Sequence, residues 1–220
     1  FDSSPQTSAS ASTPTPALAP TVVLPDTPPR VVVSSTVSMM VLNHLKQFVP
    51  SIELITRRPL DLHCLDSAPK VHEADIVVSP ATGILLTTMI NLRQRPVPIH
   101  QGANSMVAAK STDNFRRATA NVACRHSRLI VLVSENNKHS ETASPISRAD
   151  ANALAEFQGF AAALRGTAVV QVIYVGGGFE TLAKWISAII CQYHPAEGQP
   201  FRNYLLPVET MWEVFLRRVG

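Results

Sequence analysis

One short stretch of the sequence gathers side chains that could hold a metal ion. His72 and Glu73 precede Asp75, and an apolar run follows directly. Carboxylate oxygens and imidazole nitrogens are common ligands of divalent cations. The next apolar run, Gly83–Thr87, supplies no further carboxylate. We therefore expect exposed side chains here, with Asp75 fixing the local backbone, rather than a metal site.

A run of three glycines, Gly176–Gly178, follows a predicted strand and precedes a predicted helix. Backbone amides at the start of a helix can bind phosphate at this place in an α/β fold. The spacing G-x-G-x-x-G of dinucleotide-binding proteins is absent, and so is G-x-x-x-x-G-K-[ST]. The glycines favour a flexible turn, with binding of a nucleotide or a methyl donor as the alternative. No cofactor is expected.

Nucleophilic catalysis has little support in the residue pattern. The G-x-S-x-G turn of serine hydrolases is missing. His63 and Cys64 are adjacent, and neighbouring side chains of an extended chain point to opposite sides. The three cysteines, Cys64, Cys124 and Cys191, form no C-x-x-C pair. They indicate reduced, mostly buried thiols of an intracellular protein.

Short apolar runs alternate with helical patterns from Val31 onwards. Apolar residues recur with the helical period over 37–49, and Pro50 ends that pattern. The runs 75–79 and 83–87 lie so close together that they predict an antiparallel hairpin. This alternation is typical of an α/β fold with a mainly parallel central sheet flanked by helices. The other predicted strands are 31–33, 52–56 and two buried ones, 129–133 and 169–175, and the other predicted helices are a short one near 89–92, 115–126 with Asp113 or Asn114 as its cap, 148–164 and 180–193.

The two ends of the chain differ from the body at 31–195. Residues 1–30 consist mainly of Pro, Ser, Thr and Ala, which bury too little apolar surface to offset the ordering entropy, so they predict a disordered linker. Residues 196–220 break the alternation and predict a linker with the start of a new helix. No apolar run is long enough to cross a bilayer, and the net charge of +3 does not require nucleic acid as a partner.

The segment from Ala74 to Asn91 reads A-D-I-V-V-S-P-A-T-G-I-L-L-T-T-M-I-N. It resembles the catalytic run of the XPF family of structure-specific nucleases, which has G-D, a strand, a turn, a second strand ending in E-R-K, and then x-x-x-D. Aligned on the shared D-x-x-x-[ST]-P, Asp75 takes the place of the first acid. The places of the Glu, the Arg, the Lys and the last Asp are taken by Leu85, Leu86, Thr87 and Asn91.

Other parts of the body continue the resemblance. Ser34 stands where the first strand of the family ends in Asp, and 115–117 and 125–128 are similar to its Arg-containing helix and the basic residue before a buried strand. The resemblance spans 31–195 and implies a restriction-endonuclease-like architecture. Because metal-dependent cleavage of a phosphodiester needs carboxylates, it also implies an inactive nuclease homologue and not an enzyme.

Within this superfamily the chain is most similar to the meiotic crossover-promoting proteins of the "shortage in chiasmata" (Zip-two-like) group. That resemblance implies a nuclear scaffold that forms a heterodimer with a smaller, ERCC-one-like subunit. The heterodimer is expected to bind branched DNA during homologous recombination, away from any membrane. The residues expected to contact DNA are Arg116 and Arg117, followed by Arg93 and Arg95. Trp212–Gly220 resembles the first helix of a truncated helix-hairpin-helix module.

Other functions are compatible with the same residues. One is an active, metal-dependent structure-specific nuclease whose acids have moved to other positions. Another is an α/β enzyme that binds a nucleotide or S-adenosylmethionine at Gly176–Gly178. A third is a protein-binding module without any role on DNA.

Overall fold

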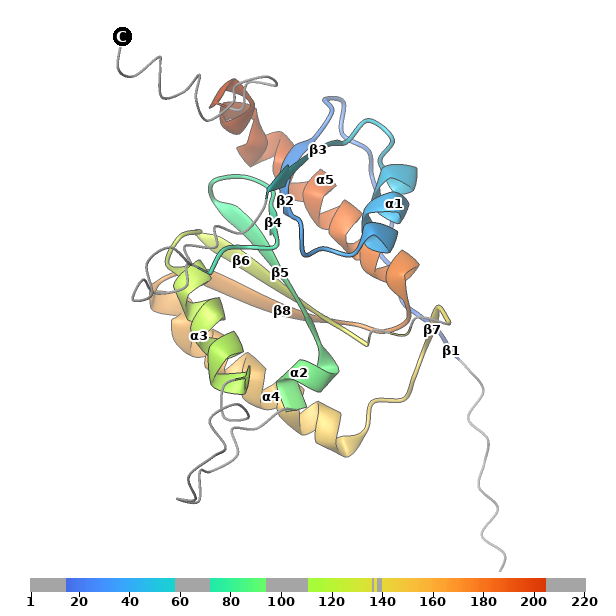
Figure 1. The fold of residues 1–220 in the computed structure, drawn as a ribbon, viewed down its shortest axis with the longest axis vertical. Coiled ribbons are helices and arrows are strands. Elements are labelled where there is room, and N and C mark those ends of the chain that lie inside the picture. Colours follow the sequence, from blue (N-terminus) through green and yellow to red (C-terminus); the bar gives the residue numbers. More distant parts are fainter. Residues whose placement is uncertain (1–14, 58–71, 94–110, 136, 138–139, 205–220) are drawn as a thin grey trace, which may run out of the picture.

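A six-stranded sheet forms the centre of the molecule (Figure 1). The computed structural model describes residues 15–57, 72–93, 111–135, 137 and 140–204. The strands lie in the order β3-β2-β4-β5-β6-β8, and all are mutually parallel except β4, which is antiparallel to its neighbours. Their bounds are β2 (Arg30–Ser34), β3 (Glu53–Arg57), β4 (Ile76–Val77), β5 (Thr82–Thr88), β6 (Arg128–Ser134) and β8 (Val169–Val175).

Helices cover both faces of this sheet, which confirms the predicted α/β fold (Figure 1). On one face, α1 (Met39–Phe48) and α5 (Phe179–Tyr204) form a core with the inward side chains of β2, β4, β5 and β6. On the other face, α2 (Met89–Arg93), α3 (Ser111–Ala123) and α4 (Arg148–Ala163) pack against β5, β6 and β8. A short helix, η2 (Leu164–Gly166), leads from α4 into β8.

Strand β6 shows why the apolar runs predicted strands so well. Its side chains alternate between the two cores, with Ile130 and Leu132 toward α1 and α5, and Leu129, Val131 and Val133 toward the opposite helices. A strand that is buried on both faces needs a continuous apolar run. Strand β8 is different, because it lies at the edge of the sheet, where Val169 and Gln171 are exposed and only Val175 is buried, so the prediction of a second buried strand was wrong.

The predicted hairpin between β4 and β5 is confirmed, but β4 has only two residues. The hydroxyl Oγ of Ser79 accepts the backbone N–H groups of Ala81 and Thr82, at 3.2 and 2.9 Å, which fixes the turn. The turn already begins at Val78, whose N–H donates to the carbonyl of Thr82. The ladder therefore has no room for the longer strand expected over 75–79.

Two helices have different bounds from those predicted. Helix α3 begins at Ser111, so Asp113 and Asn114 lie inside its first turn and do not cap it. Helix α5 continues through Pro195 to Tyr204, where a break was expected. A proline removes one backbone hydrogen bond and bends a helix, but it does not always end it.

Residues 15–29 are ordered along the body, which corrects the expectation of a disordered linker for this part of 1–30. Strand β1 (Thr15–Pro16) pairs antiparallel with β7 (Thr142–Ala143), inside a stretch predicted as loop. The carbonyl of Leu18 accepts the indole N–H of Trp185 at 3.1 Å, and Val22 packs against the α1–α5 core. Backbone pairing, the hydrogen bond from Trp185 and the packing of Val22 hold this segment against the body, which its composition alone did not indicate.

The cysteines follow the expectation only in part. Cys191 is buried in α5, and burial raises the pKa of its thiol. Cys124 is exposed at the end of α3, because it follows the last helical turn. Cys64 and its neighbour His63 lie outside the described residues, as does Trp212–Gly220.

Candidate functional site

The positions of the XPF-like motif converge at one edge of the sheet, where the parallel strands have their carboxyl ends. Ser34 ends β2, and its N–H donates to the carbonyl of Asp75 at 2.7 Å. Carboxylate oxygen Oδ2 of Asp75 accepts the N–H of Leu86 in β5, also at 2.7 Å. In open α/β sheets this edge is the usual place for a ligand site.

The carboxylate of Asp75 completes the backbone pairing of β5. Pairing between β4 and β5 ends at Ile76, so the N–H of Leu86 lies beyond the reach of the short strand. The side chain of Asp75 accepts that N–H instead. Burial raises the pKa of Asp75 to about 6, although the Leu86 N–H acts in the opposite direction. Asp75 thus has a structural role, as the sequence predicted for its part in fixing the backbone.

The two leucines of the motif point into opposite cores. Leu85 is 5% exposed and belongs to the core beneath α2, α3 and α4, together with Met89 and Val131. Leu86 is partly buried against the core of α1 and α5. A carboxylate at Leu85 would lose its hydration without gaining a partner, which costs several kcal/mol.

The remaining motif positions do not extend a polar site. Thr87 is buried, and its hydroxyl has no hydrogen-bond partner among the described residues. Asn91 is exposed in α2, where its backbone N–H donates weakly to the hydroxyl of Thr88 at 3.4 Å. Within the described ranges no three His, Cys, Asp or Glu side chains gather as metal ligands.

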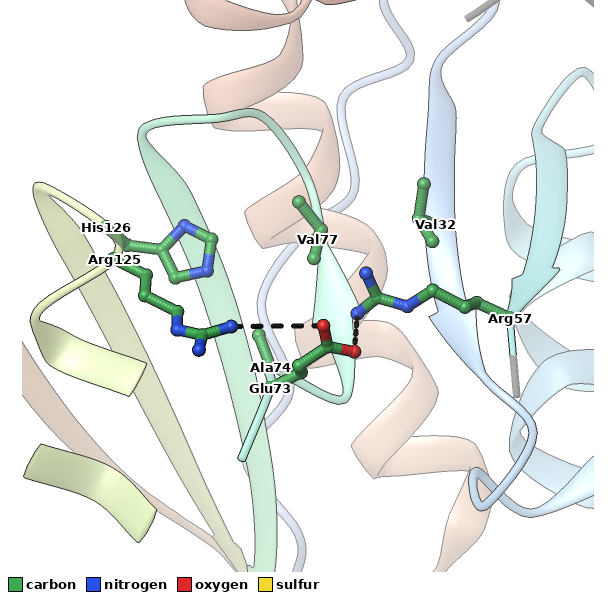
Figure 2. Close-up of a pocket in the computed structure, with 7 residues that line it drawn as sticks. All are labelled: Val32, Arg57, Glu73, Ala74, Val77, Arg125 and His126. Carbon is green, nitrogen blue, oxygen red and sulfur yellow. Dashed lines mark ion pairs between the residues drawn. The ribbon is translucent and has the colours of Figure 1, made fainter. Parts of the chain in front are cut away.

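A cavity of about 230 Å³ opens on the sheet beside this edge (Figure 2). Figure 2 shows the carboxylate of Glu73 between the guanidinium groups of two arginines. Glu73 lies 2.7 Å from the nitrogen Nη2 of Arg57 and 3.9 Å from Nη1 of Arg125. The lining residues are Val32, Arg57, Glu73, Ala74, Val77, Arg125 and His126.

A second hollow, of about 190 Å³, adjoins the first. It shares Arg57, Glu73 and Ala74 with the first cavity and adds Ser34 and Asp75 from the motif. Because the two hollows share three lining residues, we describe them together as the Glu73 groove, which is lined by the residues of both. Ser34 and Asp75 thus lie close to Arg57, which lines both hollows.

The first cavity of the Glu73 groove carries a net positive charge at neutral pH, whereas Asp75 adds a second carboxyl group to the other hollow. Desolvation lowers the pKa of His126, and the charges of Arg125 and Arg57 lower it further, while a contact at 3.2 Å with the carbonyl of Pro80 acts in the opposite direction. The imidazole is therefore neutral, and two guanidinium groups face the single carboxylate of Glu73. Arginine forks suit phosphate and carboxylate groups.

The imidazole of His126 depends on a glycine in β5. A Cβ atom at Gly83 would lie 2.9 Å from the ring of His126 and 3.0 Å from the Cβ of Ala74. Only a residue without a side chain leaves room for the imidazole on the strand at this point. Gly83 in the motif run is therefore explained by the shape of the groove wall.

Of the four arginines that were expected to contact DNA, the three that the structure describes do not line the groove. Arg93 is bound to Asp150 and Ser147, and Arg116 lies 3.8 Å from Glu156, so both interact with α4 or its cap. Arg117 is exposed on α3. Arg95 lies outside the described residues. Arg57 was not predicted as a site residue, and Arg125 was identified only as a basic residue. The two arginines meet at Glu73 from segments that are far apart in the chain, so no local pattern indicates the contact.

The glycine run at the start of α5 already holds a carboxylate of the chain itself. Glu141 accepts the N–H groups of Gly178, Glu180 and Thr181 at 3.0–3.1 Å, and the hydroxyl of Thr181 at 2.7 Å. Desolvation favours the protonated form, but these hydrogen bonds outweigh it and lower the pKa of Glu141. The helix start is occupied as an anion site would be.

Close packing explains why three glycines stand here. Gly177 has a φ of +83°, the left-handed conformation that glycine adopts without strain. A Cβ atom at Gly178 would lie 2.4 Å from the carboxylate of Glu141 and 2.8 Å from the carbonyl of Asn137. The run thus lets the segment of Glu141 approach the helix, which corrects the expectation of a merely flexible turn.

Six mostly parallel strands with helices on both faces define an α/β domain with a groove at the carboxyl edge of its sheet. Residues 21–201 match the model of a family described as a domain of unknown function (DUF7102), and the chain belongs to this family. No curated protein matches the chain. Among the helices of the described part, none is long and apolar enough to span a membrane.

Proposed function

We propose that this chain is a non-catalytic, XPF-like scaffold domain that forms a heterodimer with a smaller, ERCC-one-like subunit and supports the binding of branched DNA. The restriction-endonuclease-like version of the α/β fold, the nuclear location and the role in meiotic recombination are parts of the same proposal. The observation that carries it is the environment of the motif positions: Leu85 is buried in a core, and Asp75 is engaged by the backbone.

Cleavage of a phosphodiester by the chemistry of the XPF family needs several carboxylates around a divalent cation. At the edge of the sheet, Asp75 is one such group, but one of its two carboxylate oxygens already accepts the N–H of Leu86. Glu73 is held by Arg57 and Arg125. These observations favour a domain that has kept its shape and lost the reaction.

Binding of DNA has its support in the Glu73 groove. Arg57 and Arg125 are each about half exposed, so a phosphate can reach them from solvent. Phosphate contacts position a protein on DNA without reading its sequence. Such contacts suit a scaffold that recognises the shape of a branch.

The test is an assay of binding and cleavage with the heterodimer and branched DNA, in Mg²⁺ or Mn²⁺. We expect a retained fork or four-way junction and no cleavage above the background without protein. Cleavage that Asp75→Ala abolishes would overturn the proposal in favour of a nuclease with relocated acids. Failure to bind branched DNA while the subunits stay associated would leave a protein-binding module.

The alternative of a nucleotide or S-adenosylmethionine site at Gly176–Gly178 gains no support from the geometry. The amides that would bind a phosphate there already donate to Glu141. We expect no shift in the melting temperature with ATP, GTP or S-adenosylmethionine. A concentration-dependent rise that Gly178→Ala removes would reinstate this function.

A further inference from the structure

The outer edge of β8 is an uncovered end of the sheet in the described part of the chain. β8 pairs with β6 on one side, and the strand order ends there. Its sequence, Val-Val-Gln-Val-Ile-Tyr-Val, contains no charge, no proline and no glycine. Its first residue, Val169, is 61% exposed. Exposed edge strands normally carry charges, prolines or bulges that prevent pairing with another chain.

The backbone groups of this edge are arranged to receive an extended strand. The N–H of Val169 donates to the carbonyl of Ser127, and the carbonyl of Val175 accepts the N–H of Glu135. The backbone N–H and C=O groups of the odd-numbered residues of β8 therefore point toward β6. Those of the even-numbered residues point outward, because the direction alternates along a strand. The outward residues are Val170, Val172 and Tyr174.

The edge is complementary to a second copy of itself. If two β8 strands pair antiparallel around Val172, each Val172 faces the other, and Val170 faces Tyr174. Every outward N–H then meets an outward carbonyl, and each face of the sheet continues into the same face of the other copy. The side chains brought together are Val, Gln, Ile and Tyr, so no like charges oppose each other across the pair.

Helix α4 beside this edge leaves room for a second copy. Its flank with Glu156 and Phe160 lies toward Arg116 of α3. At 100° per residue, the opposite flank carries Ala151, Gln158 and Ala162, which are all exposed. Small, uncharged side chains allow two helices to approach closely when their strands join.

We propose that two copies of this chain associate through the outer edge of β8, antiparallel around Val172, so that their sheets become one and their α4 helices lie together. This inference does not rest on the proposed function, since it concerns a backbone edge and not the Glu73 groove. The partner it names is a second copy, because the strand complements itself in register, in polarity and in charge.

The test measures self-association of the whole chain by sedimentation equilibrium, with two pairs of variants. Val172→Pro removes an N–H that points outward, so it is expected to keep the fold and abolish the dimer. Ile173→Pro removes an N–H that bonds to β6, so it is expected to unfold the chain. Gln171→Lys places like charges diagonally across the pair and is expected to weaken association about tenfold or more, whereas Gln47→Lys on the exposed side of α1 leaves it unchanged.

Amide hydrogen exchange identifies the surface directly. The amides of Val170, Val172 and Tyr174 should gain protection as the concentration of the chain rises, while those of Gln171 and Ile173 are protected at every concentration. A chain that stays monomeric at its highest soluble concentration overturns the proposal. So does a dimer that both Val172→Pro and Gln171→Lys leave intact. A monomer whose capture by an ERCC-one-like subunit is blocked by Val172→Pro also overturns it, and leaves the proposed function standing.

Discussion

At the scale of single residues, the degenerate motif consists of side chains with structural partners. Asp75 completes a backbone ladder, Leu85 and Leu86 fill two different cores, and Gly83 makes room for His126. The two leucines that align with catalytic residues in the proposed XPF-like comparison are thereby tied to packing. Two predictions about stability follow at this scale.

The first concerns the carboxyl group of Asp75 and pH. Its pKa of about 6 in the folded chain lies above the ordinary value of about 4, so the folded chain binds more protons between these values. The free energy of unfolding therefore falls as pH rises from about 4 to about 6, by on the order of 3 kcal/mol at most, and then levels off. Asp75→Asn, whose amide oxygen still accepts the N–H of Leu86, should lack this fall.

The measurement is urea unfolding of the wild type and of Asp75→Asn between pH 4 and pH 7. Only the difference between the two proteins is diagnostic, since other carboxyl groups titrate in the same range. Asp75→Ala is the control, because it leaves the Leu86 N–H without an acceptor and should be about 1–3 kcal/mol less stable than Asp75→Asn at every pH. A constant difference between wild type and Asp75→Asn would show that the carboxyl group is not buried as described.

The second concerns Leu85 and Leu86. Leu85→Ala leaves a cavity in a closed core and should lower the free energy of unfolding by about 2–5 kcal/mol. Leu86→Ala should cost about half as much, because Leu86 is only partly buried. Guanidinium unfolding of both variants compares them, and equal losses would contradict the assignment of the two side chains to different environments.

At the scale of elements, the alternation of apolar residues predicted most strands and helices, since each side chain of a strand or helix has a fixed direction. The hairpin 75–87 and the buried strand 129–133 were predictable for this reason. The pairing of β1 with β7, the capping of α5 by Glu141 and the convergence of Arg57 with Arg125 were not. These contacts join residues far apart in the chain, and the local periodicity of apolar residues does not indicate such contacts.

The cap of α5 yields a prediction at this scale. Hydrogen bonds lower the pKa of Glu141 in the folded chain. Its contribution to the free energy of unfolding is therefore present above the ordinary glutamate pKa of about 4.3, and is lost as pH falls through the pKa of the folded state. Glu141→Gln should therefore cost about 1–2 kcal/mol at pH 7, and less at pH 3. Thermal unfolding at both pH values measures this loss.

Glu156→Gln is the matched control for Glu141. It removes the same charge from an exposed position near Arg116, and should change stability by less than about 1 kcal/mol. Equal losses of stability for the two substitutions would mean that the hydrogen bonds at the start of α5 contribute no stability beyond the effect of removing one negative charge.

At the scale of the whole molecule, the cavity beside Arg57 and Arg125 is where the fold offers positive charge to the proposed DNA partner. Arg57 comes from β3, Arg125 follows α3, and Glu73 precedes β4, so three separate elements meet there. Among the arginines predicted to contact DNA, Arg93, Arg116 and Arg117 lie on another part of the surface, around α3 and α4. DNA binding can therefore be assigned to one of two surfaces by substitution.

The predicted change in affinity for branched DNA depends on whether an acidic or a basic residue of the groove is substituted. Glu73→Gln frees both arginines and should tighten the binding of branched DNA by the heterodimer, whereas Arg57→Ala with Arg125→Ala should weaken it and reduce the salt slope by about 2. Arg116→Ala with Arg117→Ala tests the other surface, and Arg165→Ala is a control on η2. If Glu73→Gln has no effect on affinity, the groove is not the contact surface.

The two-residue length of β4 has a mechanical consequence. Within the described residues, a short ladder at Ile76 and Val77, with the flanking bonds of Asp75 and Val78, joins the β2–β3 half of the sheet to the β5–β6–β8 half. The two halves are held together mainly by side-chain packing. Helix α5 contributes most, because it contacts both β2 and β8. Under a pulling force the sheet should part at β4 first, while each half keeps its own ladder.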